Sequence, residues 1–231
     1  MCYISCMVSR KEDFVTGEYY HLYNRGNSKQ LIFLDDQDRK RFTQLLYLCN
    51  SDKSFNFRDD IIEKGIDTFD FERGKQIVSV GAWVLMPNHF HFYVSPRGGL
   101  GETSGLAYYL GKVCSSYSMY FNKKHERTGT LFEGPFKSTH IEDDNQAKYL
   151  FSYIHLNPVK LIDSKWRENG IKDYKKALKF LDSYQWSSHH EYRGKKRPEN
   201  KIISSKDFPD YFSDSKVFDE EIFDWLTFKE N

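Results

Sequence analysis

The spacing of apolar residues in the first 75 positions indicates a strand followed by a helix. The segment "EYYHLYNRG" at residues 18–26 is rich in aromatic residues and ends in Asn-Arg-Gly, which predicts a strand that runs into a turn. In "DDQDRKRFTQLLYLC" the apolar residues fall on one helical face, and Asp35 or Asp36 can cap the helix. Residues 51–75 are polar and weakly patterned, so we expect a loop-like insertion with a short helix at about 59–64.

The middle of the chain predicts a hairpin and a long helix. The segments "QIVSVGAWVLM" at 76–86 and "HFHFYVS" at 89–95 both have the composition of strands. They are joined by Pro87-Asn88, a short turn that favours an antiparallel hairpin. Over residues 106–125 apolar positions recur at helical spacing.

A further strand and a helix follow. The segment "GTLFEGPFKSTHI" at 129–141 is typical of a strand interrupted by glycines. The segment "EDDNQAKYLFSYIHLNPV" at 142–159 has acidic residues at its start and Pro158 near its end, which predicts a helix. The order strand, helix, hairpin, helix, strand, helix predicts an α+β fold, in which helices pack on a central antiparallel β-sheet.

The pattern changes after residue 161. We therefore expect a compact domain over 1–161 and a basic, aromatic C-terminal extension over 162–231 that packs on this domain or continues it. The formal net charge of the whole chain is only +1, so the total charge does not point to a nucleic-acid partner. Between residues 160 and 201, however, twelve Lys or Arg stand against six Asp or Glu. The positive charge is concentrated in the extension.

Composition excludes several classes of protein. With 231 residues, of which 39% are hydrophobic and 17% aromatic, the chain can bury a substantial core. No run of eighteen apolar residues is present, and the first basic residues follow the apolar start of the chain, so we expect a soluble cytoplasmic protein and no membrane partner. The scattered cysteines predict reduced thiols, with neither a disulfide framework nor a four-thiolate zinc site: Cys2, Cys6, Cys49 and Cys114.

Two histidines lie at strand spacing in the second hairpin strand. Because residues i and i+2 of a strand point to the same face, His89 and His91 place two imidazoles side by side, while Phe90 and Phe92 point to the core. Two neutral imidazoles can bind a divalent ion, although a third donor or a substrate oxygen must complete the coordination shell. The alternative is a pair of half-buried histidines bonded to backbone or water, and the spacing alone leaves both open.

The last predicted helix carries a phenol and an amide on one face. Tyr153 and Asn157 are four residues apart and therefore project about one turn from each other. The alternative is that Tyr149, Tyr153 and Leu156 only pack the helix on the sheet. Both interpretations are compatible with the sequence.

Five motifs in order resemble the REP-associated tyrosine transposases, which belong to the HUH single-strand DNA transposases and nucleases. They are "YNRGN", "HFH", "GTLFEGPFKS", "YIHLNPVK" and "YQWSSHHEYRG", and they span roughly residues 18–194. The resemblance implies the ferredoxin-like sheet arrangement of HUH nucleases, with the catalytic domain in residues 1–161. It also implies a partner, single-stranded DNA with hairpin ends. The chain would act as a monomer or a homodimer.

The resemblance also implies the roles of four residues. His89 and His91 match the HUH histidines that bind a divalent metal, Mg²⁺ or Mn²⁺, with Phe90 as the hydrophobic residue between them. Tyr153 matches the nucleophile, and Asn157 matches the position of a further metal ligand. The implied reaction cleaves and rejoins DNA through a 5′-phosphotyrosine intermediate and a free 3′-hydroxyl. Because the covalent bond retains free energy for rejoining, the reaction needs no ATP.

Other residues are candidates for contacts with DNA. His21, Arg25 and Asn27 lie in the first motif, and Lys137 precedes the last predicted helix; sheet packing or a solvated surface is the alternative for each. Charge combined with aromatic residues in the extension suits single strands and hairpin tips. The predicted contacts in the extension are Lys172, Lys175, Lys176, Arg193, Lys195, Lys196 and Arg197.

Three functions therefore compete on the sequence. The first is a metal-dependent tyrosine transposase. The second is a non-catalytic module of the same fold that binds structured DNA or RNA. The third is a hydrolytic metal enzyme that uses bound water, which is less favoured because no Asp or Glu stands near the histidine pair in the sequence. The joint presence of His89, His91, Tyr153 and Asn157 favours the first.

Overall fold

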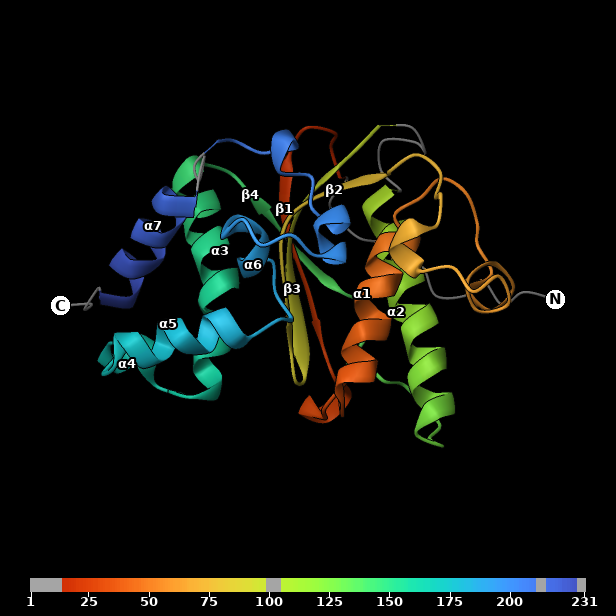
Figure 1. Cartoon of the computed structure of the whole chain (residues 1–231), viewed down its shortest axis with the longest axis horizontal. Coiled ribbons are helices and arrows are strands. Elements are labelled where there is room, and N and C mark those ends of the chain that lie inside the picture. Colours follow the sequence, from red (N-terminus) through yellow and green to blue (C-terminus); the bar gives the residue numbers. More distant parts are fainter. Residues whose placement is uncertain (1–13, 99–104, 211–214, 228–231) are drawn as a thin grey trace.

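The chain forms an α+β structure around a single four-stranded sheet (Figure 1). The computed structural model describes residues 14–98, 105–210 and 215–227. All neighbouring strands are antiparallel, in the order β2-β3-β1-β4. The strands are β1 (Tyr19–Arg25), β2 (Val78–Met86), β3 (His89–Pro96) and β4 (Lys137–Ile141). The predicted antiparallel α+β fold is thus confirmed.

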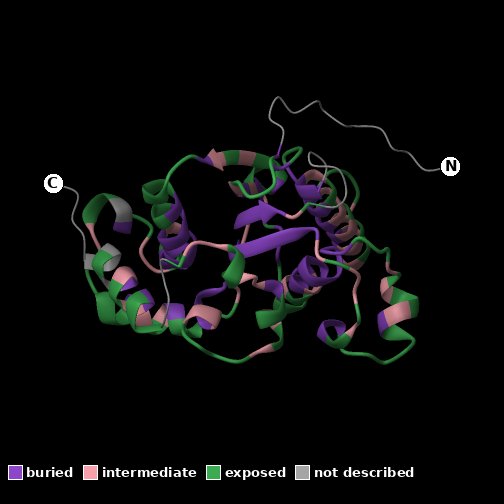
Figure 2. Cartoon of the chain, turned by 90° about the horizontal axis from the view of Figure 1, so that it is seen from above, coloured by how far each residue is buried: buried purple, intermediate pink, exposed green. Residues whose placement is uncertain are grey.

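Helices cover both faces of this sheet. Helices α1 (Asp36–Leu48) and α2 (Gly105–Lys124) pack on one face, and α3 (Asp144–Leu156) packs on the other. The order β-α-β-β-α-β with α1 and α2 on the same face is the ferredoxin-like arrangement. Figure 2 shows the buried strands enclosed between helices whose outer sides are exposed. The candidate histidines lie on the face that α3 covers.

Alternation along the strands divides the core into two layers. In β3, Phe90 and Phe92 join the layer beneath α1 and α2, whereas Tyr93 belongs to the layer beneath α3. In β2 the pairing with β3 shifts register between Val80 and Ala82, so that the residues after this bulge change faces. Each face of the sheet therefore receives its own apolar set.

Helix boundaries follow the signals in the sequence. The Asp35 carboxylate accepts a hydrogen bond from the Asp38 backbone N–H and caps α1, and Asp143 caps α3 in the same way. After α3 the chain tightens into the 3₁₀ helix η4 (Asn157–Leu161), whose second residue is Pro158. Proline has no N–H to continue the α-helical ladder, so the change of helix type falls directly at Asn157.

The insertion and the fourth strand differ in extent from the expectation. Residues 51–75 contain the short helices η2 (Phe57–Ile62) and η3 (Thr68–Asp70). The strand predicted over 129–141 is regular only in β4, because Gly129 and Gly134 have positive φ angles of 84° and 155°. The preceding loop instead runs along the end of β1, where it forms an isolated bridge between Gly26 and Phe132.

The C-terminal extension pairs with the outer edge of β2. Its elements are α4 (Trp166–Asn169), α5 (Tyr174–Ser183), α6 (His189–Tyr192), η5 (Pro198–Ile202), η6 (Ser205–Asp207) and α7 (Ser215–Thr227). The Leu85 N–H donates to Trp186 O, and the Ser188 N–H donates to Trp83 O, each at 2.9 Å. Backbone groups at the sheet edge are therefore satisfied by the extension.

A buried hydroxyl joins three parts of the structure. Ser188 Oγ accepts the Trp83 N–H at 2.9 Å and lies 2.7 Å from Nε2 of His155 in α3. Because Nδ1 of His155 lies 2.9 Å from the Phe151 carbonyl and must donate to it, Nε2 accepts the Ser188 hydroxyl proton. This hydrogen-bond chain fixes α3 against β2 and the extension.

Two of the four cysteines lie among the described residues. Cys49 is buried and Cys114 is half-buried, both as free thiols, while Cys2 and Cys6 lie outside the described residues. Burial raises the pKa of the Cys49 thiol to about 12. None of the described helices combines the length and apolar character that crossing a bilayer requires.

We predict that Ser188→Ala lowers the free energy of unfolding by about 1–3 kcal/mol, because it leaves the buried Trp83 N–H and His155 Nε2 without partners. Urea denaturation measures the change. The control is Ser183→Ala, which removes an exposed hydroxyl bonded to the Phe180 carbonyl and should stay within about 0.5 kcal/mol of the wild type. Equal unfolding midpoints for Ser188→Ala and the wild type would contradict this role.

Candidate active site between the sheet and helix α3

Strand pairing collects the candidate residues on one face. The β1–β3 register places Tyr23 opposite His91 and Arg25 opposite His89, and the β1–β4 register places Lys137 opposite Tyr23. Directly paired residues of an antiparallel sheet share a face, so β1, β3 and β4 all contribute side chains here. Helix α3 crosses this face.

His91 lies at the centre of the cluster. Its Nε2 is 3.3 Å from the Tyr153 hydroxyl oxygen, and its Nδ1 is 2.8 Å from Nε2 of His21. The His91 and Tyr153 rings meet edge to face with centroids 5.1 Å apart, and the centroid of His89 is also 5.1 Å from that of His91. Two imidazoles and one phenol, distant in sequence, therefore converge in the structure.

The flanking histidines are uncharged at neutral pH. Burial lowers the pKa of His21 to about 4. Burial, together with the positive charges of Lys160 and Arg25, lowers the pKa of His89 to about 4. His89 Nδ1 lies 2.6 Å from the side-chain oxygen of Asn88. A neutral imidazole keeps one nitrogen lone pair, as a metal ligand or a proton acceptor must.

Asn157 provides the test of whether a divalent cation fits. Its side chain is only 1% exposed and lies near enough to His89 to counter the fall of that pKa. Neither its oxygen nor its nitrogen reaches hydrogen-bond geometry with any described group. An unpaired buried amide costs about 1–3 kcal/mol, and an amide oxygen is a preferred ligand of hard divalent cations. The residues present thus fit a cation.

The donor set is small. No cluster of three or more His, Cys, Asp or Glu suited to a metal occurs among the described residues. A cation here would be held by His89, His91 and Asn157 only, so substrate oxygen or water would have to complete its shell.

Tyr149 and Tyr153 occupy different environments although they lie one helical turn apart. Their rings are parallel within 2°, with centroids 6.3 Å apart. Tyr149 is 47% exposed, whereas Tyr153 is half-buried and directs its hydroxyl to His91. Of these two tyrosines, Tyr153 is therefore the one whose hydroxyl contacts the histidine cluster.

Cationic side chains surround the cluster. Arg25, on the same face as His89, forms a two-point ion pair with Glu133, in which Nη2 donates to Oε1 at 2.8 Å. Lys137 is exposed on β4. Lys160 follows Asn157 by three residues in η4, and because residues i and i+3 of a 3₁₀ helix are eclipsed, it lies on the Asn157 side of that helix.

The remaining predicted DNA contacts are distributed over the surface. Asn27 is exposed in η1 (Asn27–Lys29), and its amide lies 3.4 Å from the Thr130 hydroxyl. Arg193 pairs with Asp182 and Asp219, and Arg197 forms a two-point ion pair with Glu191. The lysines are exposed and form no ion pair with a described residue: Lys172, Lys175, Lys176, Lys195 and Lys196. All of these DNA contacts stay predictions, and Arg197, with a side chain only 11% exposed, has a clear structural role.

Sequence reasoning missed two residues near this site and gave a third, His21, a different candidate role. His21 was considered for the DNA backbone, yet it contacts His91; its position two residues before Tyr23 and four before Arg25 was the available signal. The 3₁₀ helix η4 brings Lys160 to the site, and Pro158 is the sequence signal for this change of helix type. Glu133 had no signal, because its pairing with Arg25 depends on the path of the loop before β4.

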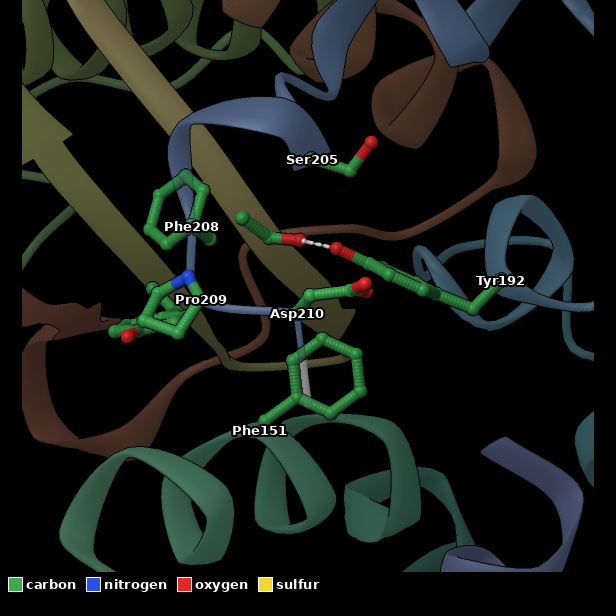
Figure 3. Close-up of a pocket in the computed structure, with 8 residues that line it drawn as sticks. Phe151, Tyr192, Ser205, Phe208, Pro209 and Asp210 are labelled. Atoms are coloured by element: carbon green, nitrogen blue, oxygen red, sulfur yellow. Dashed lines mark hydrogen bonds between the residues drawn. The ribbon is translucent and has the colours of Figure 1, made fainter. Parts of the chain in front are cut away.

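A small hollow lies further along the same face. It has a volume of about 40 Å³, room for a few ordered water molecules. Figure 3 shows Phe151, Tyr192 and Phe208 around it, and the Tyr192 hydroxyl donates to the Gly81 carbonyl at 2.6 Å. The two histidines and Tyr153 are not among its lining residues, so the hollow is separate from the candidate chemistry.

Known proteins resemble the chain in structure rather than in sequence. No protein-family model matches the chain, and no curated protein sequence matches it. Among solved structures, the chain is similar to that of a REP-associated tyrosine transposase bound to a REP hairpin, with 14% sequence identity over 84% of this chain and 90% of that chain. The TM-score is 0.47. A likeness at this level assigns no role to any residue of this chain.

We predict that Asn157→Leu keeps or raises the melting temperature of the metal-free protein, because an apolar side chain of similar size replaces an unpaired buried amide. The same substitution should reduce the rise in melting temperature that Mn²⁺ produces in the wild type. The matched control is Asn157→Asp, which retains an oxygen donor and should keep the Mn²⁺ response. An unchanged Mn²⁺ response in Asn157→Leu would rule out the amide as a ligand.

Proposed function

We propose that the chain is a tyrosine transposase that cleaves and rejoins single-stranded, hairpin-bearing DNA with the assistance of a divalent metal. The observation that carries this proposal is the 3.3 Å contact between the Tyr153 hydroxyl and Nε2 of His91, with the His89 ring beside it. A hydroxyl nucleophile within reach of a group that can activate it is the signature of covalent catalysis. The order of the sequence motifs supports the same function.

The reaction follows from the nucleophile. The Tyr153 oxygen attacks the phosphorus of a phosphodiester, forms a new phosphorus–oxygen bond, and the bond to the 3′-oxygen breaks. The tyrosine then carries a 5′-phosphate, and the released strand takes a proton as its free 3′-hydroxyl. Attack by a 3′-hydroxyl on the phosphotyrosine reverses these steps and joins strands without ATP, because one ester bond replaces another.

Tyr153 must lose its proton as it attacks, since a phenol with a pKa of about 10 is mostly protonated at neutral pH. His91 Nε2 lies 3.3 Å from that hydroxyl and can accept the proton when its lone pair is free. A divalent cation bound by His89, His91 and Asn157 would neutralise the phosphate oxygen and polarise phosphorus. Because one lone pair cannot serve both purposes, cleavage with and without Mn²⁺ or Mg²⁺ distinguishes the two routes.

The surrounding charges fit a phosphate backbone. Arg25, Lys137 and Lys160 border the cluster from three different elements. Helix α5, which carries Lys175 and Lys176, packs against η4 at the Asn157 end of α3 (Figure 1). Positive charges around the cluster and further along α5, together with the aromatic residues of the extension, suit the binding of a single strand that continues into a hairpin.

We predict that Tyr153→Phe abolishes a covalent protein–DNA product, because the attacking oxygen is removed while the ring is kept. The assay incubates the protein with end-labelled hairpin-bearing oligonucleotides and Mn²⁺ or Mg²⁺ and separates the products on a denaturing gel. Tyr149→Phe is the matched control and should retain the product. A product lost in Tyr149→Phe and kept in Tyr153→Phe would reassign the nucleophile.

We predict that Glu133→Gln increases the affinity for single-stranded DNA several-fold, because Arg25 is released from its ion pair and can bind a phosphate in the same two-point geometry. The log–log dependence of affinity on salt should steepen by about 0.7, the value for one added phosphate contact. Fluorescence anisotropy titrations measure both quantities.

The control for this variant is Glu63→Gln, which breaks the exposed ion pair with Arg58 in the insertion. It should leave DNA affinity unchanged. If Glu133→Gln bound single-stranded DNA no more tightly than the wild type, release of Arg25 from its ion pair would not create a phosphate contact.

The main alternative is a non-catalytic module that binds structured DNA or RNA on the same sheet face. The retained contact between Tyr153 and His91 favours catalysis over this alternative. Tight binding of hairpin-bearing strands, with no covalent product under any metal or end sequence, would establish the binding module instead.

A further inference from the structure

His91 has both ring nitrogens engaged, and the partner of its Nδ1 has no role in the chemistry described so far. That partner is Nε2 of His21, at 2.8 Å. The planes of the two rings lie 27° apart, and their centroids are 5.0 Å apart. The Tyr23 ring stacks on His21 with centroids 4.8 Å apart and lies 5.8 Å from the His91 ring, so the three rings form one cluster.

We propose that His21 is the positioning residue of this site: with its own proton on Nδ1, its Nε2 accepts the Nδ1–H of His91 and so leaves the Nε2 lone pair of His91 directed toward Tyr153. The inference rests on the proposed function and deepens it. The hydrogen bond at one imidazole nitrogen sets which nitrogen carries the proton. Without an acceptor at Nδ1, a neutral imidazole favours the proton on Nε2, and the nitrogen beside Tyr153 could then neither bind a cation nor accept a proton.

His89 is held in the same way by a different group. Its Nδ1 lies 2.6 Å from Asn88 Oδ1, in the hairpin turn. As a donor to that oxygen, the Nδ1–H of His89 leaves Nε2 as the available nitrogen. Each histidine of the pair thus has an acceptor at Nδ1, one from β1 and one from the turn, and both rings present the same nitrogen to the site. Such outer partners commonly set metal affinity.

Strand register makes His21 suited to this task. The Cα of His21 is paired with Tyr93 and that of Tyr23 with His91, so His21 lies diagonally across from His91 on the same face. Both strands are central in the sheet and flanked by β2 and β4. The acceptor is therefore fixed by backbone pairing, independently of α3.

The test reads the position of the His91 proton directly. Two-dimensional ¹⁵N–¹H spectra of histidine-labelled, metal-free protein at neutral pH distinguish a ring protonated on Nδ1 from one protonated on Nε2, and the His91 signal is assigned by its loss in His91→Gln. We expect His91 to carry its proton on Nδ1 in the wild type. In His21→Phe, which keeps the ring shape and removes the acceptor, the proton should move to Nε2.

Two further measurements distinguish a positioning role of His21 from a role in packing alone: rescue by a conservative variant, and affinity for metal. His21→Gln offers an amide oxygen near the position of the lost nitrogen and should keep the wild-type proton position. Mn²⁺ affinity, measured by calorimetry, should fall by about 10–100-fold in His21→Phe and much less in His21→Gln. The matched control is His140→Phe, which replaces a histidine of β4 bonded to Glu18 and should change neither readout.

The outcomes decide the proposal separately from the proposed function. A wild-type His91 with its proton on Nε2 overturns the proposal, even if His21→Phe does not fold. So does a folded His21→Phe with an unchanged His91 proton position. If the wild type never cleaves DNA but the proton moves as described, the transposase function fails while the role of His21 stands.

Discussion

The register between β1 and β3 is the constraint on which the candidate site depends. It places Tyr23 opposite His91 and thereby brings His21 within hydrogen-bond distance of the central imidazole. A slip of one residue would send the histidines into the core and bring the phenylalanines out. Phe90 and Phe92, 0% and 1% exposed, oppose such a slip because their burial beneath α1 and α2 would be lost. Burial of the apolar side chains of β3 thus determines that its histidines stand on the opposite face of the sheet.

The second requirement is the position of α3 on the sheet, because this helix carries Tyr153. The apolar side of this helix packs on β2 and β3, and the His155–Ser188–Trp83 hydrogen bonds tie it to the sheet edge. Ser188 belongs to the C-terminal extension, whose backbone also pairs with β2. The extension therefore has a structural part in placing Tyr153, in addition to the DNA contacts proposed for its exposed lysines.

Much of this arrangement was predictable because local signals agree with the fold. Period-2 alternation around His89 and His91, the Asp caps and Pro158 each have a direct local cause in the sequence. The strand before α3 was overestimated because Gly129 and Gly134 place the chain in a loop. The contacts of His21 and of Glu133 could not be read from the sequence, because they depend on strand register and on a loop path between distant segments. Tertiary pairing, rather than composition, completes the site.

The central claim is that the Tyr153 hydroxyl and the two imidazoles converge on one phosphodiester. The most direct test traps the protein on a hairpin-bearing strand with a nick just 5′ of the scissile bond, so that the short fragment released with the free 3′-hydroxyl diffuses away and cannot attack the intermediate. Mass spectrometry of the digested complex then identifies the modified peptide. The account predicts a nucleotide joined by its 5′-phosphate to Tyr153. A nucleotide on Tyr149, or on any other residue, would contradict it.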